Sequence, residues 1–134
     1  MKKLLMFCWV VGLVGCATPS GDMLNNKFFD VQTTPQEVTG FWTGAVGPYS
    51  TTIKLNADGS GTYCESFNNN EHVMNLKISN DVMYTSNGAR LKVQSINNQL
   101  AQFKNIYFGL NMEYKLYKDD DLSQASPFCK NKLS

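Results

Sequence analysis

The chain has 134 residues, a formal net charge of +1, and 43% hydrophobic against 17% charged residues. This length suggests one globular domain, and the near-neutral charge argues against a nucleic-acid partner, because such binding usually needs a concentrated basic patch. Without Lys2 and Lys3, which belong to the leader described next, ten basic groups face eleven acidic ones.

Residues 1–15 have the form of a secretory signal peptide. Two lysines are followed by an apolar stretch from Leu4 to Gly15. That stretch is shorter than the about 20 residues that a helix needs to span a bilayer. A basic start, a short apolar core and small residues before the cut are typical of a cleaved leader.

The residues at the cut, Leu13-Val14-Gly15-Cys16, resemble the lipobox of bacterial lipoproteins. The resemblance implies cleavage before Cys16, which would carry a diacylglyceryl thioether and an acylated amine and anchor the chain to a membrane. Ala17 follows, where aspartate would favour the inner membrane, so the resemblance implies the outer membrane. We expect the protein on the periplasmic face of that membrane rather than at the surface. An ordinary secretory signal with a cysteine at its cut is the alternative.

Residues 16–36 are interpreted as the lipidated cysteine and a tether, and residues 37–134 as a β-barrel-like domain with a C-terminal tail. Phe28 and Phe29 are too apolar for a free linker, and they predict either an arm packed on the domain or a segment lying against lipid headgroups. The run Thr34-Pro35-Gln36-Glu37 has the form of a capping box and predicts one helical turn.

From Phe41 onward, alternating apolar and polar residues are interrupted by turn signals about every ten residues, which is typical of short strands in an all-β domain. After the strand that begins at Phe41, we expect strands at about residues 49–56, 62–67, 72–78, 82–85, 91–95, 100–106 and 112–117. Strands joined by hairpins should pair with their neighbours in sequence. The prediction is therefore an antiparallel up-and-down meander of about eight short strands, forming a small barrel that is closed or partly open.

The four cysteines divide into two pairs. Cys8 leaves with the leader and Cys16 is taken by the lipid, so Cys64 and Cys129 remain. In a compartment that oxidises thiols, this even pair predicts a disulfide. Closing a loop of about 65 residues would stabilise the fold by roughly 4 kcal/mol at most. A metal site or a catalytic thiol finds no support in the spacing of further Cys or His residues.

The run Gly40-Phe41-Trp42 resembles the Gly-x-Trp motif that opens lipocalin and related calycin barrels. In that family the Trp closes the barrel base and often packs against an Arg from a late strand, and a disulfide often ties the C-terminal tail to an early strand. The resemblance implies a small lipocalin-like barrel over about residues 34–129. The chain departs from the family in its short barrel region and in its only arginine, Arg90, which lies on a middle strand. A buried Trp in another β-sandwich is the alternative.

Catalysis is not expected, because the chain has one histidine and neither a Gly-x-Ser-x-Gly elbow nor a phosphate-binding loop. Glu65 and Glu71 could meet across a hairpin as paired carboxylates, but exposed turn flanks are the simpler interpretation. We therefore expect neither an enzyme nor a cofactor.

Two patterns suggest metal ligands, and each has a simpler interpretation. His72 and Met74 would point to one side of a strand and could bind copper, but Leu76 and Ile78 continue that face and favour a core histidine with a satisfied ring. The acidic run 119–121 could hold calcium, but without further spaced oxygen ligands it predicts a solvated loop. No metal is expected.

A set of methionines and aromatic residues could line a ligand cavity inside the barrel, because both residue types suit adaptable apolar pockets. The candidates are Tyr63, Phe67, Met74, Met83, Phe103, Met112 and Tyr114. The same residues suit a solid core, and eight-stranded barrels occur in both forms. For so short a domain the filled core is favoured.

These observations predict a membrane-anchored, non-enzymatic binding module of the cell envelope, whose ligand would be a small apolar molecule. The alternative is a lipoprotein that binds an envelope protein, as an inhibitor of an attacking enzyme such as lysozyme or as an accessory part of an envelope complex. The run Ser86-Asn87-Gly88-Ala89-Arg90 resembles the Ser-x-Ser-Gly-x-x-Tyr loop of membrane-bound lysozyme inhibitors, with Asn87 replacing the second Ser and Leu91 replacing the Tyr. An Asn-Gly hairpin tip explains the same run without a target.

Overall fold

The computed structural model describes residues 27–105 and 112–134. The expected signal peptide, the lipobox with Cys16, Ala17 and the first part of the tether lie outside the described residues. The 3-10 helix η1 (Phe28–Asp30) comes first and the helix α2 (Pro127–Leu133) comes last. Between them lie β1 (Gly40–Val46), β2 (Tyr49–Leu55), β3 (Ser60–Phe67), β4 (Asn70–Ser79), β5 (Val82–Thr85), β6 (Arg90–Ile96), β7 (Leu100–Asn105) and β8 (Glu113–Lys118).

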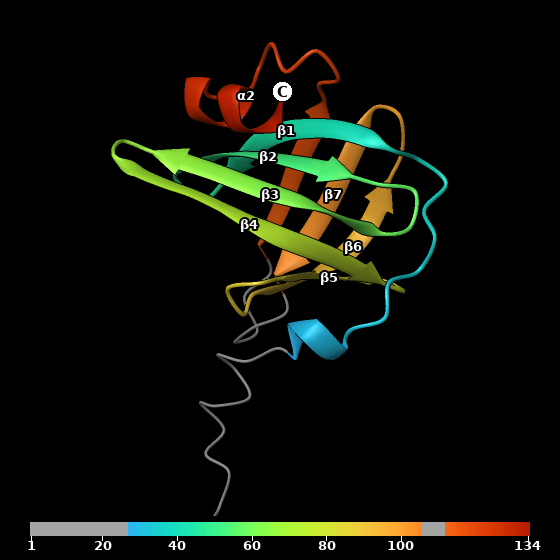
Figure 1. Cartoon of the computed structure of the whole chain (residues 1–134). Coiled ribbons are helices and arrows are strands. Elements are labelled where there is room, and N and C mark those ends of the chain that lie inside the picture. Colours follow the sequence, from blue (N-terminus) through green and yellow to red (C-terminus); the bar gives the residue numbers. More distant parts are fainter. Residues whose placement is uncertain (1–26, 106–111) are drawn as a thin grey trace, which may run out of the picture.

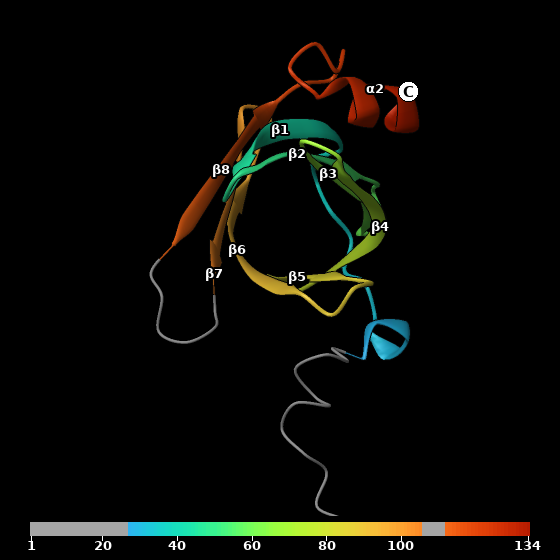
Figure 2. The same ribbon diagram turned by 90° about the vertical axis from the view of Figure 1, so that its left-hand side faces the viewer.

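Each strand pairs antiparallel with the next one along the chain, and β1 pairs with β8, so the sheet closes into a barrel. The predicted all-β meander is thus confirmed, in its closed form, and Figure 2 shows the strands as a ring. Gly44 pairs with Leu116 at the closing seam. A Cβ on Gly44 would collide with the Lys115 carbonyl and with Leu116, so glycine lets β1 approach β8 closely enough to close the barrel.

The strands alternate as the sequence predicts, with one face turned into the barrel. On β2, Ile53 and Leu55 are buried while Lys54 is exposed. On β6 the alternation breaks, because a bulge between Val93 and Ser95 shifts the register and Ile96 packs against the core instead of Ser95. The buried core comprises Trp42, Ile53, Leu55, Tyr63, Leu76, Ile78, Met83, Ala101, Phe103 and Leu116.

The helix α2 lies outside the barrel against β2–β4, most of all against β3, as Figures 1 and 2 show, and the segment before it packs on Phe41 of β1. The predicted disulfide is confirmed, since Cys64 on β3 is bonded to Cys129 on α2, 65 positions away. Around it, Leu122 and Leu133 complete a second buried cluster. Ser126 caps the helix, because its Oγ accepts a hydrogen bond from the Cys129 N–H at 3.2 Å.

The predicted helical turn at residues 34–37 is wrong, because this segment runs along the barrel without helical structure. The Thr34 N–H donates to the Ile78 carbonyl at 2.9 Å, and the Thr34 Oγ1 accepts from the Asn80 N–H at 3.0 Å. The Gln36 N–H donates to the Ala57 carbonyl at 2.8 Å. These hydrogen bonds to strand ends use the Thr34 hydroxyl and the backbone N–H groups that would otherwise belong to a helix N-terminus. A single helical turn is only marginally stable, so it does not compete with them.

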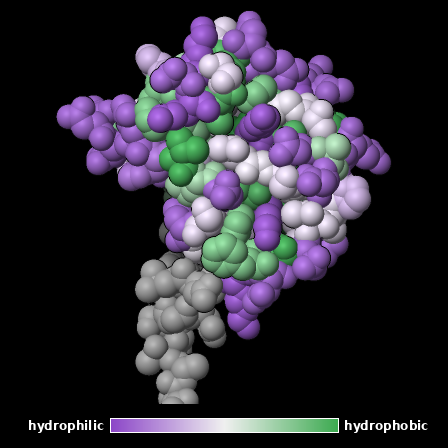
Figure 3. Space-filling model, in the orientation of Figure 1, coloured by the Kyte–Doolittle hydropathy of each residue, from purple (hydrophilic) through white to green (hydrophobic). Residues whose placement is uncertain are grey.

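Residues 27–36, which fall in the segment interpreted as a tether, pack on the barrel as an arm that begins with η1. Phe28 is buried, and the Lys77 Nζ lies 4.7 Å from its ring centroid and donates to its carbonyl at 2.9 Å. Phe29, in contrast, is 91% exposed. Figure 3 shows hydrophobic surface near the place that η1 occupies in Figure 1, while the projecting hairpin on the left is largely hydrophilic.

Candidate ligand site at the mouth of the barrel

The barrel has two different ends. We call the end covered by residues 31–39 the base, and the opposite end, with the turns at residues 47–48, 68–69 and 86–89, the mouth. The strand registers arrange the inward-facing residues of β1–β4 in four rows from base to mouth. Row 1 is Gly40, Leu55, Gly61 and Leu76; row 2 is Trp42, Ile53, Tyr63 and Met74; row 3 is Gly44, Thr51, Glu65 and His72. Row 4 is Val46, Tyr49, Phe67 and Asn70, in which a ring contact joins Tyr49 to Phe67.

The base is closed by Trp42, which is fully buried. Its Nε1 donates to the Asn97 carbonyl at 3.0 Å, and the Lys118 Nζ lies 4.0 Å from its ring centroid. Lys118 also donates to the Thr39 carbonyl and lies 3.4 Å from the Asp120 carboxylate. A lysine of the last strand therefore packs on the motif Trp at the place where the lipocalin resemblance implies an arginine. Arg90 pairs with Tyr84 on a middle strand instead.

Rows 1 and 2 are filled by apolar side chains. Ile53, Leu55 and Leu76 are at most 1% exposed, and from the other wall Met83 and Phe103 are equally buried. These side chains form one cluster that spans the barrel. The lower half of the barrel is therefore a solid core, as the short length of the domain predicts.

Row 3, which we call the polar row, differs from the rows on either side. Thr51 is fully buried, and its Oγ1 makes no hydrogen bond within the described residues. Thr51 pairs with Glu65, which in turn pairs with His72. Burial raises the pKa of Glu65, because a low-polarity environment disfavours the carboxylate, while His72 acts in the opposite direction. Polar groups are thus placed inside the barrel, above its apolar core.

Two tyrosines extend this polar level. Burial raises the pKa of Tyr63, and the nearby charge of Glu65 raises it further. The Thr51 hydroxyl lies close enough to lower that pKa, although the two groups do not meet hydrogen-bond geometry. Tyr114 of β8, which packs partly buried against the core cluster, also raises the pKa of Tyr63. Thr51, Tyr63 and Glu65 therefore lie close together on the inward faces of β2 and β3.

A hollow of about 490 Å³ opens beside Glu65 and His72 at the mouth, and its lining is Glu65, His72, Val73, Met74, Ser86 and Asn87. It forms where β4 continues beyond β5, because their pairing ends at Leu76 and Thr85. Nearer the mouth on β2 and β3, the rings of Tyr49 and Phe67 meet edge to face with centroids 5.9 Å apart. The hollow thus gives access to the side chains of Glu65 and His72, with Met74 beside them.

The candidate cavity residues separate into three groups. Tyr63, Met83 and Phe103 are buried in the core, and Met74 and Tyr114 pack against it partly buried. Phe67 and Met112 are 40% and 46% exposed, so they do not belong to the interior. Both lie near strand ends at the mouth, where the alternation of apolar and polar residues in the sequence extends beyond the packed interior of the barrel.

The expected core position of His72 is wrong, because this residue is exposed. It faces inward in register, but the β3–β4 hairpin projects beyond β5, on the left of Figure 1, and carries His72 past the packed interior. The partner of Glu65 across this hairpin is His72, whereas Glu71 pairs with Ser66. Within the described residues, no group of three or more His, Cys, Asp or Glu side chains is placed to hold a metal ion.

The expected solvated loop at residues 119–121 is wrong for its first member. Asp119 is 4% exposed, and its carboxylate accepts hydrogen bonds from the Gln124 N–H and the Ser123 hydroxyl. Asp120 is exposed and accepts from the Phe41 N–H at 3.0 Å. The acidic run therefore makes hydrogen bonds within the C-terminal segment and between that segment and β1.

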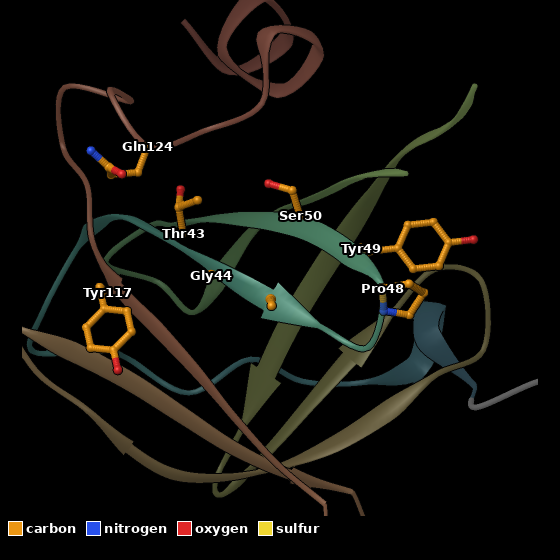
Figure 4. A pocket seen from close by; sticks show the side chains of 8 residues that line it. Thr43, Gly44, Pro48, Tyr49, Ser50, Tyr117 and Gln124 are labelled. Atoms are coloured by element: carbon orange, nitrogen blue, oxygen red, sulfur yellow. The ribbon is translucent and has the colours of Figure 1, made fainter. Parts of the chain in front are cut away.

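A larger hollow, of about 620 Å³, lies on the outside of the barrel (Figure 4). Thr43, Gly44, Ala45, Pro48, Tyr49, Ser50, Tyr117 and Gln124 line it. Tyr117 is 59% exposed there, and the Thr43 hydroxyl is already bonded to that of Thr52 at 2.7 Å. We place the candidate site at the mouth despite the smaller volume of its hollow, because that hollow is lined by two inward-facing residues of the polar row, Glu65 and His72.

Sequence reasoning missed Thr51 and Lys118. Both interrupt an apolar face, since Thr51 alternates with Ile53 and Leu55, and Lys118 follows Leu116 on β8. A polar residue on an otherwise apolar face is the signal that would have found them.

A family model described as "Bacterial lipocalin LPS transport optimiser YedD" matches residues 25–133, which is most of the chain. No curated protein and no solved structure matches the chain significantly. Among the described residues, none of the helices has the length and apolar character needed to cross a membrane.

Proposed function

This chain belongs to the YedD family of bacterial lipocalins, and on that basis we propose that it is a binding protein of the cell envelope. The family description joins a lipocalin barrel to lipopolysaccharide transport, which takes place in the bacterial envelope. Lipocalin barrels are typically binding proteins, which supports this proposal. Three finer proposals concern its anchor, its ligand and its role in transport.

The anchor is a lipid on Cys16, after cleavage of residues 1–15, and it holds the protein at the periplasmic face of the outer membrane. The lipobox resemblance of Leu13–Cys16 supports this proposal, as does Ala17. The exposed Phe29 at the start of the described chain suits contact with lipid headgroups. Radioactive palmitate should label the wild-type protein, and Cys16→Ser should abolish the label and release the protein from membranes. A labelled Cys16→Ser variant would refute the anchor.

The ligand is a small molecule held at the mouth of the barrel. The single observation that supports this proposal is the accessible hollow at the mouth, whose lining includes Glu65 and His72 of the polar row. Protein produced with its own leader and purified from the envelope should show a bound species in a gentle native mass spectrum. The species should leave on collisional activation, and a bare mass under all conditions would contradict the proposal.

The role in lipopolysaccharide transport is that of an accessory protein rather than a carrier of the lipid. Rows 1 and 2 are solid, so the barrel interior holds side chains where several long acyl chains would have to lie. Deletion of the gene should delay the appearance of newly made lipopolysaccharide at the cell surface, and the wild-type gene should restore it. Unchanged arrival would count against this role.

Binding of an envelope protein is a second candidate function, favoured by the β3–β4 hairpin. Residues 70–74 of β4 extend beyond the pairing with β5, and Val73 is 45% exposed there. Such a strand edge can accept a further strand from another protein. A photo-crosslinking residue at Val73 should capture one defined partner in cells, whereas the same group at Tyr117 should not. Equal crosslinking at both positions would argue against a specific edge.

A further inference from the structure

The outer faces of the barrel differ in what covers them. The helix α2 lies against β2–β4 and is bonded to β3 through Cys129. The strand β5 and the helix η1 lie on the opposite side of the barrel from α2, as Figures 1 and 2 show. The C-terminal helix therefore leaves the outer face around β5 uncovered.

Basic side chains gather on this uncovered face. Lys92 on β6 pairs with Lys104 on β7, and Tyr84 on β5 pairs with Lys77 on one side. On its other side Tyr84 pairs with Arg90. Apolar residues next to each of these five along the strands belong to the core cluster or pack against it, so the five side chains face outward. We call these five residues the basic wall.

The acidic residues nearby do not neutralise the basic wall. The carboxylate of Glu113, on β8, accepts hydrogen bonds from Gln94 and Gln102 at 3.5 and 3.3 Å. It pairs with Lys104 in the sheet, but no ion pair joins the two side chains. Asp81 lies in the turn before β5, at the edge of the wall. The basic side chains of the wall outnumber these acids, so the face is positively charged.

The described chain begins beside this face. Phe28 of η1 lies against Lys77 of the wall, and the next residue, Phe29, is 91% exposed. Lys27 and Asp30, at the two ends of η1, have opposite charges. An exposed aromatic ring beside a cluster of basic side chains is the combination that favours contact with an anionic membrane surface.

We propose that the basic wall, with Phe29 at its edge, docks on the anionic headgroups of the membrane that carries the lipid anchor. This inference rests on the proposed anchor. Cys16 is 11 positions before Lys27, so the chain between them extends to at most about 40 Å. Each basic side chain near an anionic surface strengthens binding about fivefold, and a tether raises the effective concentration, so a few contacts suffice.

Docking through the basic wall would fix the orientation of the barrel. Figure 2 looks through the ring of strands, and the wall and η1 lie on one side of that ring. The barrel axis would then run along the membrane surface, with α2 facing away from the lipid. The mouth would open sideways, so an amphiphilic ligand would reach it along the membrane surface.

The test measures how close β5 comes to lipid. Processed, lipidated protein with Tyr84→Trp is inserted into preformed phosphatidylcholine vesicles, with or without about one third phosphatidylglycerol, and brominated lipid serves as the quencher. Trp42 contributes little because it is fully buried, and Trp9 lies in the expected leader. We expect quenching about threefold or more stronger on the anionic vesicles, and high salt should abolish the difference.

The matched variants remove equal charge from opposite sides of the barrel. Lys92→Gln combined with Lys104→Gln should remove most of the quenching gained on anionic vesicles, because each lysine lost weakens docking about fivefold. Lys130→Gln combined with Lys132→Gln, on α2, should leave that quenching unchanged. Phe128→Trp, also on α2, should be quenched on neither membrane.

Two results would overturn the inference: equal quenching of Tyr84→Trp on neutral and anionic vesicles, or equal loss of quenching in both double variants. Palmitate labelling of Cys16 without quenching of Tyr84→Trp would disprove the docking surface and leave the anchor standing. Quenching of an unlabelled protein would do the reverse. Protection of Lys92 and Lys104 from acetylation in whole envelopes but not on anionic vesicles would assign the wall to a protein partner, and the inference would be wrong.

Discussion

The base and the mouth of the barrel are built from the same strands, yet their interiors differ. At the base, Trp42 and the apolar residues around it are at most a few per cent exposed. The Trp42 Nε1 donates a hydrogen bond to the Asn97 carbonyl, and the Lys118 ammonium lies over the Trp42 ring. At the mouth, Thr51 is buried without a partner, Glu65 is half-buried, and His72 and Phe67 are exposed. The base therefore has the apolar, well-packed side chains of a stable core, whereas the mouth has polar side chains that a purely apolar core would not contain.

The residues that stabilise the fold thus lie at the base of the barrel, and the residues of the candidate binding site lie at its mouth. Because neighbouring strands contribute to both ends, a change in one row can be compared with a change two residues away on the same strand. Variants at the base should affect unfolding strongly, and variants at the mouth should affect it weakly or in the favourable direction. The predictions below test that contrast, from the largest expected effect to the smallest.

Trp42→Ala should have the largest effect, a loss of about 3–5 kcal/mol in the free energy of unfolding, because it empties the centre of the base. Circular dichroism during urea unfolding is the suitable measurement, since the fluorescence of Trp42 is lost with the residue. Tyr117→Ala, which removes an exposed ring from the outer wall, is the control and should cost less than about 1 kcal/mol. A loss below 1 kcal/mol for Trp42→Ala would mean that the base does not dominate stability.

Removal of the disulfide should come next. The double variant Cys64→Ala, Cys129→Ala opens a loop of 65 positions and should cost about 2–4 kcal/mol. Hydrogen exchange should show faster exchange in α2, which the bond holds to β3, while the core strands around Trp42 remain the most protected. Equal loss of protection in α2 and in the base would show that the C-terminal cover and the core unfold as one unit.

Lys118→Met should cost about 1 kcal/mol, because it removes the ammonium that lies 4.0 Å from the Trp42 ring centroid and 3.4 Å from Asp120. Thermal unfolding at low and high salt measures this loss, which should shrink as salt screens the ion pair. Lys118→Arg should retain the stability, since a guanidinium can make the same contacts. The control is Lys54→Met, whose ammonium is exposed and lies 5.9 Å from the Phe41 ring; a cost equal to that of Lys118→Met would refute a special role for Lys118.

Glu65→Gln should have the smallest effect, and it should depend on pH. Burial raises the pKa of Glu65 in the fold, so the folded protein holds this proton to higher pH than the unfolded chain does. Wild-type stability therefore falls as pH rises from the ordinary glutamate value of 4.5 through the raised pKa, and the neutral glutamine avoids this loss. We expect a gain below about 1 kcal/mol at neutral pH that disappears in acid, because the group is still partly solvated.

The measurement is a series of urea unfolding midpoints between pH 4 and pH 8, roughly the range over which a raised glutamate pKa acts. Glu71→Gln changes an exposed neighbour on the other face of the hairpin and serves as the control. A destabilised Glu65→Gln protein at neutral pH would mean that the charged form of Glu65 is held by favourable contacts, and the contrast between mouth and base would weaken.

Local pattern determined much of the fold. Alternation and turn residues are properties of neighbouring positions, and they located the eight strands within a few residues and turned Ile53 and Leu55 inward. Cysteine counting identified the Cys64–Cys129 bond, because two of the four cysteines were already assigned. The motif Gly40-Phe41-Trp42 indicated a lipocalin-like barrel, which the structure and the family match confirm.

The candidate site depended on relations that no local pattern contains. Strand register brings Thr51, Glu65 and His72 into one row, although they lie on three strands. The short β5 leaves the end of β4 beyond the packed interior, so His72 is exposed where its alternation with Leu76 and Ile78 suggested burial. Long-range contacts also decide the conformation at Thr34. Its N–H donates to the Ile78 carbonyl and its hydroxyl accepts from the Asn80 N–H, so neither group caps a helix.

The sequence by itself determined the strands, the faces of most of them and the disulfide, because these follow from periodicity, turn chemistry and residue counts. Only the tertiary structure decided which end of the barrel is solid, which lysine packs on Trp42, and which polar groups meet above the core. The physical reason is that register, shear and strand length set how distant segments align, and burial or exposure follows from that alignment rather than from the residue's own neighbours in the chain.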